Sequence, residues 1–300
     1  MIHDSTHKPV LLHEVLEYLN PKPGDFIIDG TVDGGGHAAA IAQAIGAEGK
    51  FLGVDWDEAM IKKTGDRFAD RKNMKFVHGN YTELPEILKE NKLSKADGLL
   101  LDLGFSSEQL EGSGRGFSFL KDEPLLMTYG SDAEPAWKIL REFDERELAK
   151  MIFALSGEKF AMRIARAIKA SGKKKRIETS GELARVIREA FPGGYERGRI
   201  DPATRTFQAL RIYANKELEN VKTTLANLKE IVKPGGRAVV ISFHSLEDGI
   251  VKHSFIGMKQ AGDAEILTKK PVIATEEETR DNPRSRSAKL RAITLLKTTT

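Results

Sequence analysis

The sequence predicts an α/β protein built on a mostly parallel, doubly wound sheet, with a helical domain inserted into the chain. Short apolar runs that each end in aspartate occur at residues 25–29, 50–55 and 98–102, with helix-forming segments between them. Unbroken apolar strands joined through helices are typical of a buried parallel sheet. From about residue 108 to residue 204 the strand signal is almost absent, which indicates the insertion.

Three further segments complete the predicted sheet. Residues 74–77 form a strand in the first half of the chain. Residues 237–243 form a strand after a Pro-Gly-Gly turn at residues 234–236, and residues 290–296 form an edge strand.

The insertion is predicted to be helical over residues 133–187. Its apolar residues follow a helical repeat, and they include Leu148, Ile152, Phe153, Ile164 and Ile168. The first domain is therefore expected to be discontinuous. Residues 1–107 and 205–300 would form it, and residues 108–204 would form the inserted helical domain, with a role in substrate recognition.

Composition excludes several classes of protein. Of the 300 residues, 40% are hydrophobic and 30% charged, as in an ordinary soluble globular protein. No apolar run approaches the roughly 18 residues of a membrane-spanning helix, and residues 1–20 lack a signal-peptide pattern, so we expect a cytoplasmic protein without a membrane partner. Without cysteine there are no disulfides or thiolate ligands, and the seven scattered histidines form no His-x-x-x-His pair, so we predict no metal site.

Positive charge is concentrated in the second half of the insertion. Between Lys159 and Arg211 fourteen Lys and Arg residues accompany five Asp and Glu residues, although the whole chain carries only +3. Such asymmetry indicates contact with a polyanion, and a solvated helical face is the alternative. The candidate contacts are Lys173, Lys174, Lys175 and Arg176, with Arg199, Arg205 and Arg211 near the return to the sheet. Arg205 and Arg211 could instead form structural ion pairs.

A glycine-rich loop follows the first predicted strand. It reads DGTVDGGGH from Asp29 to His37, and it precedes an alanine-rich helical segment. Glycines let a backbone approach a ligand closely in front of a helix N-terminus, and Asp55, at the end of the second strand, could accept both hydroxyls of a cofactor ribose. These features fit a nicotinamide dinucleotide or S-adenosylmethionine. Asp29 favours S-adenosylmethionine, because a carboxylate suits its cationic methionyl group and would repel a pyrophosphate.

The fourth strand ends at Asp102, where ligands of parallel sheets bind. The exocyclic amine of a base is a poor nucleophile, because its lone pair is delocalised into the ring. Asp102 could accept hydrogen bonds from such an amine, while a nearby aromatic ring stacks on the flipped base. The alternative is that Asp102 only caps a helix or ends a strand. Since three strands end in aspartate, we interpret Asp102 as catalytic.

Three other segments leave alternatives open. Residues 7–12 are predicted to form an extended arm that leads into a helix. A purely structural role, with the arm packed on the protein, is the simpler interpretation. His244 lies beside Glu247 and Asp248, which fits either a metal or acid–base site or a hydrogen-bonded turn. Residues 282–289 are basic and turn-forming, so they either contact phosphate or form a solvated loop.

Together these segments resemble the bacterial family of 16S rRNA cytosine-N4 methyltransferases, the MraW type. The resemblance runs through nearly the whole chain and is carried by HKPVLLHEVL, DGTVDGGGHA, LLLDLGFSSEQL, RGFSF, DPATRTFQALRIYANKEL, ISFHSLED and NPRSRSAKLR. It implies a Rossmann-like methyltransferase fold with an inserted helical domain, and S-adenosyl-L-methionine as methyl donor. The implied substrate is the N4 amine of a cytidine in the decoding region of 16S rRNA, within the small ribosomal subunit. The oligomeric state of the chain stays open between a monomer and a homodimer.

The resemblance also implies a set of cofactor contacts. In this sequence they fall on Gly35, Gly36, His37, Asp55, Tyr81, Asp102 and Gln109. Tyr81 replaces the Phe that is usual in the family and keeps an aromatic face. Asp29 joins this set through the charge argument above.

The chain departs from the family pattern at several positions. An acid and an arginine that are usual there are replaced by Leu126 and Thr128, a second acid by Lys159, and an arginine by Gly249. Because of these departures, an alternative function stays open: the chain could be a cofactor-binding ribosome assembly factor with weak or altered methylation activity. Another nucleic-acid amino-methyltransferase is a further alternative, although a DNA enzyme would normally carry a proline-rich motif at Asp102. A nicotinamide-dependent dehydrogenase is disfavoured by Asp29 and by the spacing of the glycines.

Overall fold

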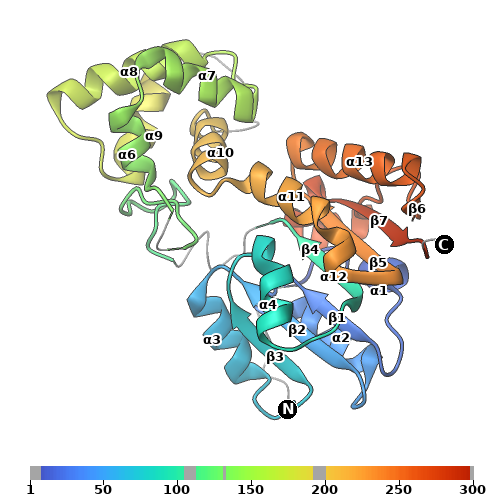
Figure 1. Cartoon of the computed structure of the whole chain (residues 1–300). Coiled ribbons are helices and arrows are strands. Elements are labelled where there is room, and N and C mark those ends of the chain that lie inside the picture. The colour runs from blue at the N-terminus through green and yellow to red at the C-terminus, as the bar shows by residue number, and fades with distance from the viewer. Residues whose placement is uncertain (1–7, 105–112, 131–132, 192–200, 298–300) are drawn as a thin grey trace. The chain divides into compact units, whose positions relative to one another are not determined.

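The computed structural model describes residues 8–104, 113–130, 133–191 and 201–297. The chain divides into two compact units, one comprising Met1–Gly104 with Leu218–Thr300, the other Phe105–Glu217. The first contains the sheet and the second is helical (Figure 1). The predicted return to the sheet domain at residue 205 falls inside helix α10 (Ala203–Ala214), which lies wholly in the helical unit. No described helix is long and apolar enough to cross a bilayer.

The sheet unit confirms the predicted α/β class. Its seven strands lie in the order β3-β2-β1-β4-β5-β7-β6. The pairs among β1 to β5 are parallel, whereas β7 is antiparallel to both of its neighbours. The strands are β1 (Phe26–Asp29), β2 (Lys50–Asp55), β3 (Met74–His78), β4 (Ala96–Asp102), β5 (Val232–Ser242), β6 (Ala264–Ile266) and β7 (Lys289–Leu295).

Two details of the sheet differ from the prediction. The segment predicted as an edge strand is β7, which lies between β5 and β6, and the edge is the three-residue β6. So short a strand leaves too little periodicity to detect. The predicted Pro-Gly-Gly turn is part of β5, where the register with β4 shifts between Ala96 and Gly98. A bulge accommodates the extra residues there, and Gly235 takes a φ of 86° that favours glycine.

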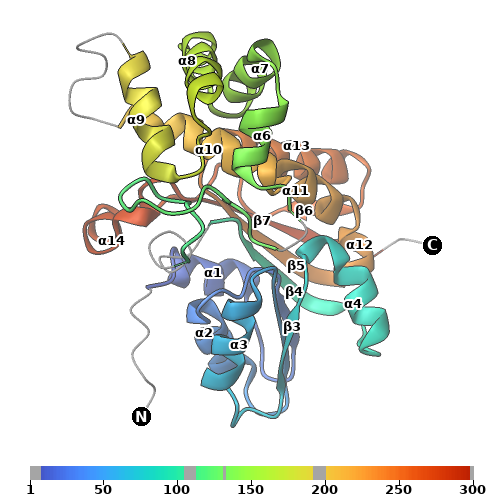
Figure 2. The ribbon, with the colours of Figure 1, turned by 90° about the vertical axis from the view of Figure 1, so that its left-hand side faces the viewer.

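Helices cover both faces of this sheet, as Figures 1 and 2 show. Alternate side chains of one strand enter different cores: Ile28 packs in one cluster and Ile27 in the other. Both faces are therefore buried, which explains the continuous apolar runs. The elements around the strands are α1 (Leu12–Leu19), α2 (Gly36–Ile45), α3 (Glu58–Arg67), η1 (Tyr81–Glu83), α4 (Leu84–Glu90), α11 (Glu217–Ala226), α12 (Leu228–Ile231), α13 (Ser245–Gln260), α14 (Glu276–Asp281) and η2 (Pro283–Ser287).

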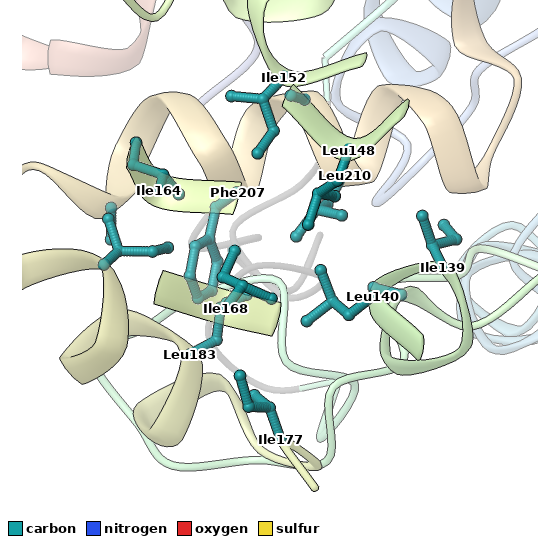
Figure 3. Packing of buried hydrophobic residues seen from close by; sticks show 14 of the residues in the cluster. Ile139, Leu140, Leu148, Ile152, Ile164, Ile168, Ile177, Leu183, Phe207 and Leu210 are labelled. Atoms are coloured by element: carbon teal, nitrogen blue, oxygen red, sulfur yellow. The ribbon is translucent and has the colours of Figure 1, made fainter. Parts of the chain in front are cut away.

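The helical unit has its own core. It is built from α6 (Ala136–Glu142), α7 (Glu145–Ser156), α8 (Ala161–Lys174), α9 (Ser180–Ala190) and α10. Figure 3 shows its apolar side chains meeting, among them Ile139, Leu148, Ile152, Ile164, Ile168, Leu183, Phe207 and Leu210. Phe153 is an exception to the predicted apolar stripe, because it is 59% exposed. It follows Ile152 directly, and consecutive helical residues point about 100° apart.

Candidate active site

Three buried or half-buried carboxyl groups end three neighbouring strands of the sheet. Asp29, Asp55 and Asp102 are the last residues of β1, β2 and β4. Asp29 pairs with Gly53 and with Leu100, so Asp55 and Asp102 each lie two residues beyond the position opposite Asp29. Because side chains alternate with a period of two, the three carboxyl groups share one face of the sheet at its carboxyl edge. The predicted cofactor acids and the predicted catalytic acid are therefore brought together.

The glycine loop is tied to these strand ends by hydrogen bonds. The backbone N–H and the hydroxyl of Thr31 donate to Asp29 Oδ1 at 3.1 and 3.3 Å. The same hydroxyl accepts the backbone N–H of Asp102 at 2.7 Å. Thr31 thus joins the ends of β1 and β4. Sequence reasoning missed this role, which only the pairing of the strands reveals.

Two glycines of the loop lie where a Cβ atom would be crowded by neighbouring residues. Gly35 has a φ of 75°, and a Cβ atom there would lie 2.9 Å from Thr64. At Gly36, the first residue of α2, a Cβ would lie 3.1 Å from Pro9 of the N-terminal arm. From α3, Arg67 donates to the Gly34 carbonyl at 2.7 Å. The loop is therefore held close to its neighbours in front of the N-terminus of α2, as the sequence predicts for a ligand loop.

Both oxygens of Asp55 accept backbone N–H groups. Oδ2 accepts from Asp33 at 2.9 Å and Oδ1 from Asp57 at 2.8 Å. Each carboxylate oxygen has two acceptor sites, so these bonds leave room for ligand hydroxyls. Burial nevertheless raises the pKa of Asp55 to about 6, against the lowering effect of the two N–H donors.

Asp29 is the most perturbed of the three acids. It is 1% exposed, and burial raises its pKa to about 7, although His37 and the Thr31 N–H oppose the shift. A carboxyl group with a shifted pKa at the end of a strand is typical of functional sites. A cation beside Asp29 would favour its ionised form, so the site suits a positively charged ligand group. This agrees with the charge argument for S-adenosylmethionine.

His37 and Asp102 have polar atoms without partners. His37 Nε2 lies 3.6 Å from Asp102 Oδ2, which is too far for a hydrogen bond. In the described part of the chain, neither ring nitrogen of His37 nor Asp102 Oδ1 has a hydrogen-bond partner, although all are buried. Buried polar groups are rarely left unpaired, so these atoms fit a polar ligand at the carboxyl edge.

The remaining predicted cofactor residues are Tyr81 and Gln109. Tyr81 begins η1 after β3 and is half-buried. A Cβ atom added at Gly30 would lie 3.1 Å from the Cβ atom of Tyr81, so Tyr81 lies against the start of the glycine loop. Gln109 lies outside the described residues, as do Phe105 to Ser107, which follow β4.

His244 belongs to a helix cap. Its Nδ1 accepts the backbone N–H of Glu247 at 3.4 Å, and Glu247 Oε2 accepts the N–H groups of Phe243 and His244 at 2.9 and 3.3 Å. This reciprocal pattern is a capping box at the start of α13. The hydrogen-bonded turn, one of the two alternatives, is therefore present.

The basic candidates in the helical unit differ in their partners. Lys173, Lys174, Lys175 and Arg176 are all exposed at the end of α8, and Lys175 pairs with Glu182 at 2.5 Å. Arg205 lies 3.4 Å from the buried Glu158. Arg211 donates two bonds to Glu217 at 2.8 and 3.0 Å. Arg205 and Arg211 thus have the structural ion pairs considered above, and Arg199 lies outside the described residues.

The segment that carries the main departures is held through its main chain. Asn215 donates to the Met127 carbonyl at 2.7 Å and accepts the Tyr129 N–H at 2.8 Å. Arg115 donates to the carbonyls of Thr128 and Tyr129 at 3.1 and 2.8 Å. These bonds do not depend on which side chains stand at 126 and 128. Lys159 is exposed, and a Cβ at Gly249 would meet no atom within 4 Å.

Comparison with known proteins gives this site its context. Residues 4–296 match the profile of the MraW methylase family. The chain belongs to the MraW methylase family. Its methyl donor is therefore S-adenosyl-L-methionine, and the predicted resemblance is confirmed.

Two relatives that share one name support the same family. The ribosomal RNA small subunit methyltransferase H of Syntrophus aciditrophicus is 42% identical over 96% of this chain and 96% of its own. The protein of the same name from Deinococcus deserti is 43% identical over 95% of this chain and 92% of its own. Among solved structures, an rRNA methylase from Streptococcus thermophilus is 9% identical, with a TM-score of 0.45 over 98% of this chain and 100% of its own.

Proposed function

We propose that this MraW-family chain methylates the exocyclic N4 amine of a cytidine in the decoding region of 16S rRNA, within the small ribosomal subunit. The observation that carries the proposal is the carboxyl group of Asp102. It stands at the strand edge beside Asp29 with Oδ1 unpaired among the described residues. The names of the relatives support rRNA as the substrate, and the cytosine specificity rests on the resemblance described above.

The residues around the glycine loop would hold the cofactor. Asp29 would face its ammonium group and Asp55 its ribose hydroxyls. The backbone of Gly35, Gly36 and His37 would line the methionyl part, Tyr81 would offer an aromatic face, and Gln109 joins this set through the resemblance alone. The cofactor supplies a methyl group on a positively charged sulfur, so neither a metal nor a covalent enzyme intermediate is needed.

The role of Asp102 follows from the chemistry of the amine. A hydrogen bond from the amine to Asp102 Oδ1 holds the nitrogen in position and favours tetrahedral geometry, which makes its lone pair available. The attacking nitrogen acquires positive charge and must then lose a proton. The Asp102 carboxylate stabilises that charge and can accept the proton.

A substitution of Asp55 tests the assignment of the ribose site. Replacing Asp55 by Ala should weaken S-adenosyl-L-methionine binding by about ten- to hundredfold, because a charge-assisted hydrogen bond contributes roughly 1.5–3 kcal/mol. Titration calorimetry measures this directly. Asp57→Ala is the matched control, since Asp57 is a buried neighbour whose Oδ1 caps α3 through the Ala59 N–H at 3.1 Å. Equal affinity in the Asp55 variant and wild type would remove Asp55 from the site.

The basic cluster at the end of α8, residues 173–176, is proposed to bind RNA phosphates. Replacing all four residues by Ala should weaken RNA binding and reduce the slope of log affinity against log salt by up to about 0.7 for each phosphate that the variant no longer binds. Cofactor affinity should not change, because the cofactor residues that the structure describes, from Asp29 to Asp102, belong to the other unit. Arg205 and Arg211 are poorer tests, since their acidic partners Glu158 and Glu217 are buried and would be left unpaired.

A matched control for the fourfold variant removes the same charge elsewhere. Lys252, Lys259, Lys269 and Lys270 are exposed on the sheet unit, so their joint replacement by Ala should leave the salt slope unchanged. If the two fourfold variants bind RNA alike across a salt titration, residues 173–176 are a solvated surface.

The proposed reaction itself is tested by mass spectrometry of rRNA nucleosides. Small subunits from cells that lack this protein should contain an unmodified cytidine, which purified protein and S-adenosyl-L-methionine convert to N4-methylcytidine. Assays on naked 16S rRNA and on assembled subunits identify the form that is recognised. Methylation of another atom would overturn the cytosine specificity. Cofactor binding without any transfer would favour an assembly factor.

A further inference from the structure

The helical unit contains a cavity that the proposed methyl-transfer site does not use. It lies between α6 and α8, with Trp137 on the first helix, Gly172 and Lys173 on the second, and Arg176 in the segment that follows. Its volume is about 230 Å³. Typical ligand pockets occupy roughly 300–1,000 Å³, so this cavity suits a single small ring system.

Apolar side chains and one aromatic ring line the interior of the cavity. Leu140, Ile168 and Ile177 line it, and all three are buried members of the helical core (Figure 3). Trp137 is partly buried against that core, and the Arg141 guanidinium lies 5.2 Å from the centre of its ring. Because the guanidinium lies over one face of the ring, a base would stack on the other face, as bases do on aromatic side chains of single-strand binding sites.

Charged side chains also line the cavity, and the cations Lys169, Lys173 and Arg176 outnumber the one carboxylate, Glu178. Lys173 and Arg176 are exposed, and neither has an ion-pair partner within the described residues. Lys169 is not available to a ligand in the same way. Its Nζ donates to the carbonyls of Leu140, Arg141 and Phe143 and so caps the C-terminal end of α6. The Lys173 and Arg176 side chains could therefore bind a phosphate beside an occupant of the cavity.

We propose that this cavity holds one unstacked nucleobase of the RNA, with Trp137 stacking on the base and Lys173 and Arg176 binding its phosphates. The proposal rests on the proposed function, since it assigns part of the RNA to the helical unit. A purely apolar ligand would not use the cations, and a phosphate alone would not use the tryptophan. The combination of ring and charge is that of a nucleotide.

Gly172 is a lining position at which a side chain can be added without a clash at its Cβ atom. It lines the cavity, lies within α8, and a Cβ there would meet no atom within 4 Å. Gly172→Leu should occupy the cavity, whereas Gly172→Ala leaves most of it open. Both raise the helix propensity of α8. Stacking of one base on an aromatic ring corresponds to a roughly 5- to 150-fold change in affinity, so Gly172→Leu should bind single-stranded RNA that much more weakly than Gly172→Ala.

Tryptophan fluorescence reports on the same cavity. The chain has two tryptophans, Trp56 and Trp137, so a Trp56→Phe protein carries only the reporter in α6. Single-stranded RNA oligonucleotides should quench its emission saturably. The quenching should persist with Gly172→Ala and disappear with Gly172→Leu. Trp137→Ala should lower RNA affinity like Gly172→Leu, and circular dichroism checks that both variants fold.

Each outcome bears on the proposal separately from the reaction. Equal RNA binding and equal quenching in the two Gly172 variants would overturn the base site, even if wild-type protein methylates rRNA. Quenching by RNA in a protein that transfers no methyl group would retain the base site and reject the proposed function. If cytidine or adenosine monophosphate saturates the site and RNA does not compete, the occupant is a free nucleotide and the RNA assignment is wrong.

Discussion

Asp102→Ala should lower methyl transfer by roughly 10²- to 10⁴-fold, the range expected when a positioned proton acceptor is removed. The physical reason is that Asp102 Oδ1 is an unpaired acceptor, among the described residues, at the carboxyl edge of β4. Without it the amine keeps its lone pair in the ring, and the charge that develops on nitrogen is not stabilised. The rate should be measured in single turnovers at saturating S-adenosyl-L-methionine, so that any loss of cofactor affinity does not enter.

A carboxylate at the other end of the same strand provides the control. Asp97 lies near the start of β4, where it accepts the Phe26 N–H at 3.1 Å and pairs with Lys233. Asp97→Ala should reduce the melting temperature more than Asp102→Ala does, yet retain turnover. Near-normal turnover of the Asp102 variant, with the control equally active, would show that another group holds the amine.

Asp29→Asn should have the second large effect, on both stability and cofactor binding. The pKa of Asp29 is about 7 in the folded protein, above its ordinary value of 3.8. The folded state therefore binds the proton more tightly, so the stabilisation is complete below pH 3.8 and is lost as the pH rises to about 7. Over that pH range the free energy of unfolding should fall by up to about 4 kcal/mol. Asn has no such titration and can still accept the Thr31 bonds through its amide oxygen.

Chemical denaturation across pH tests this directly. From pH 4 to pH 8 the Asn variant should gain stability relative to wild type, by an amount that approaches the figure above. Its affinity for S-adenosyl-L-methionine should fall. We expect the affinity of wild type to rise with pH near 7, as Asp29 ionises, and that of the Asn variant to show no such rise. A stability difference that is the same at pH 4 and pH 8 would contradict the role of burial at Asp29.

The sequence predicts the fold class correctly but misses some of its elements. Asp29, Asp55 and Asp102 were predicted from strands that end in aspartate, and the structure places all three on neighbouring strands. The edge strand β6 was missed, because three residues carry no periodicity. Thr31 was missed as well, because its bond to the Asp102 N–H joins positions 71 residues apart.

Local pattern and charge are properties of the chain, so the sequence by itself determined the α/β class, the glycine loop, the acidic strand ends and the basic segment. The tertiary structure decided which of these groups are buried or paired. Burial, which depends on packing from every side, raises the pKa of Asp29. Contacts distant in sequence give Arg205 an acidic partner and place Trp137 beside Arg176 at one cavity. No local pattern encodes these, because each arises only when separate helices pack around a common core.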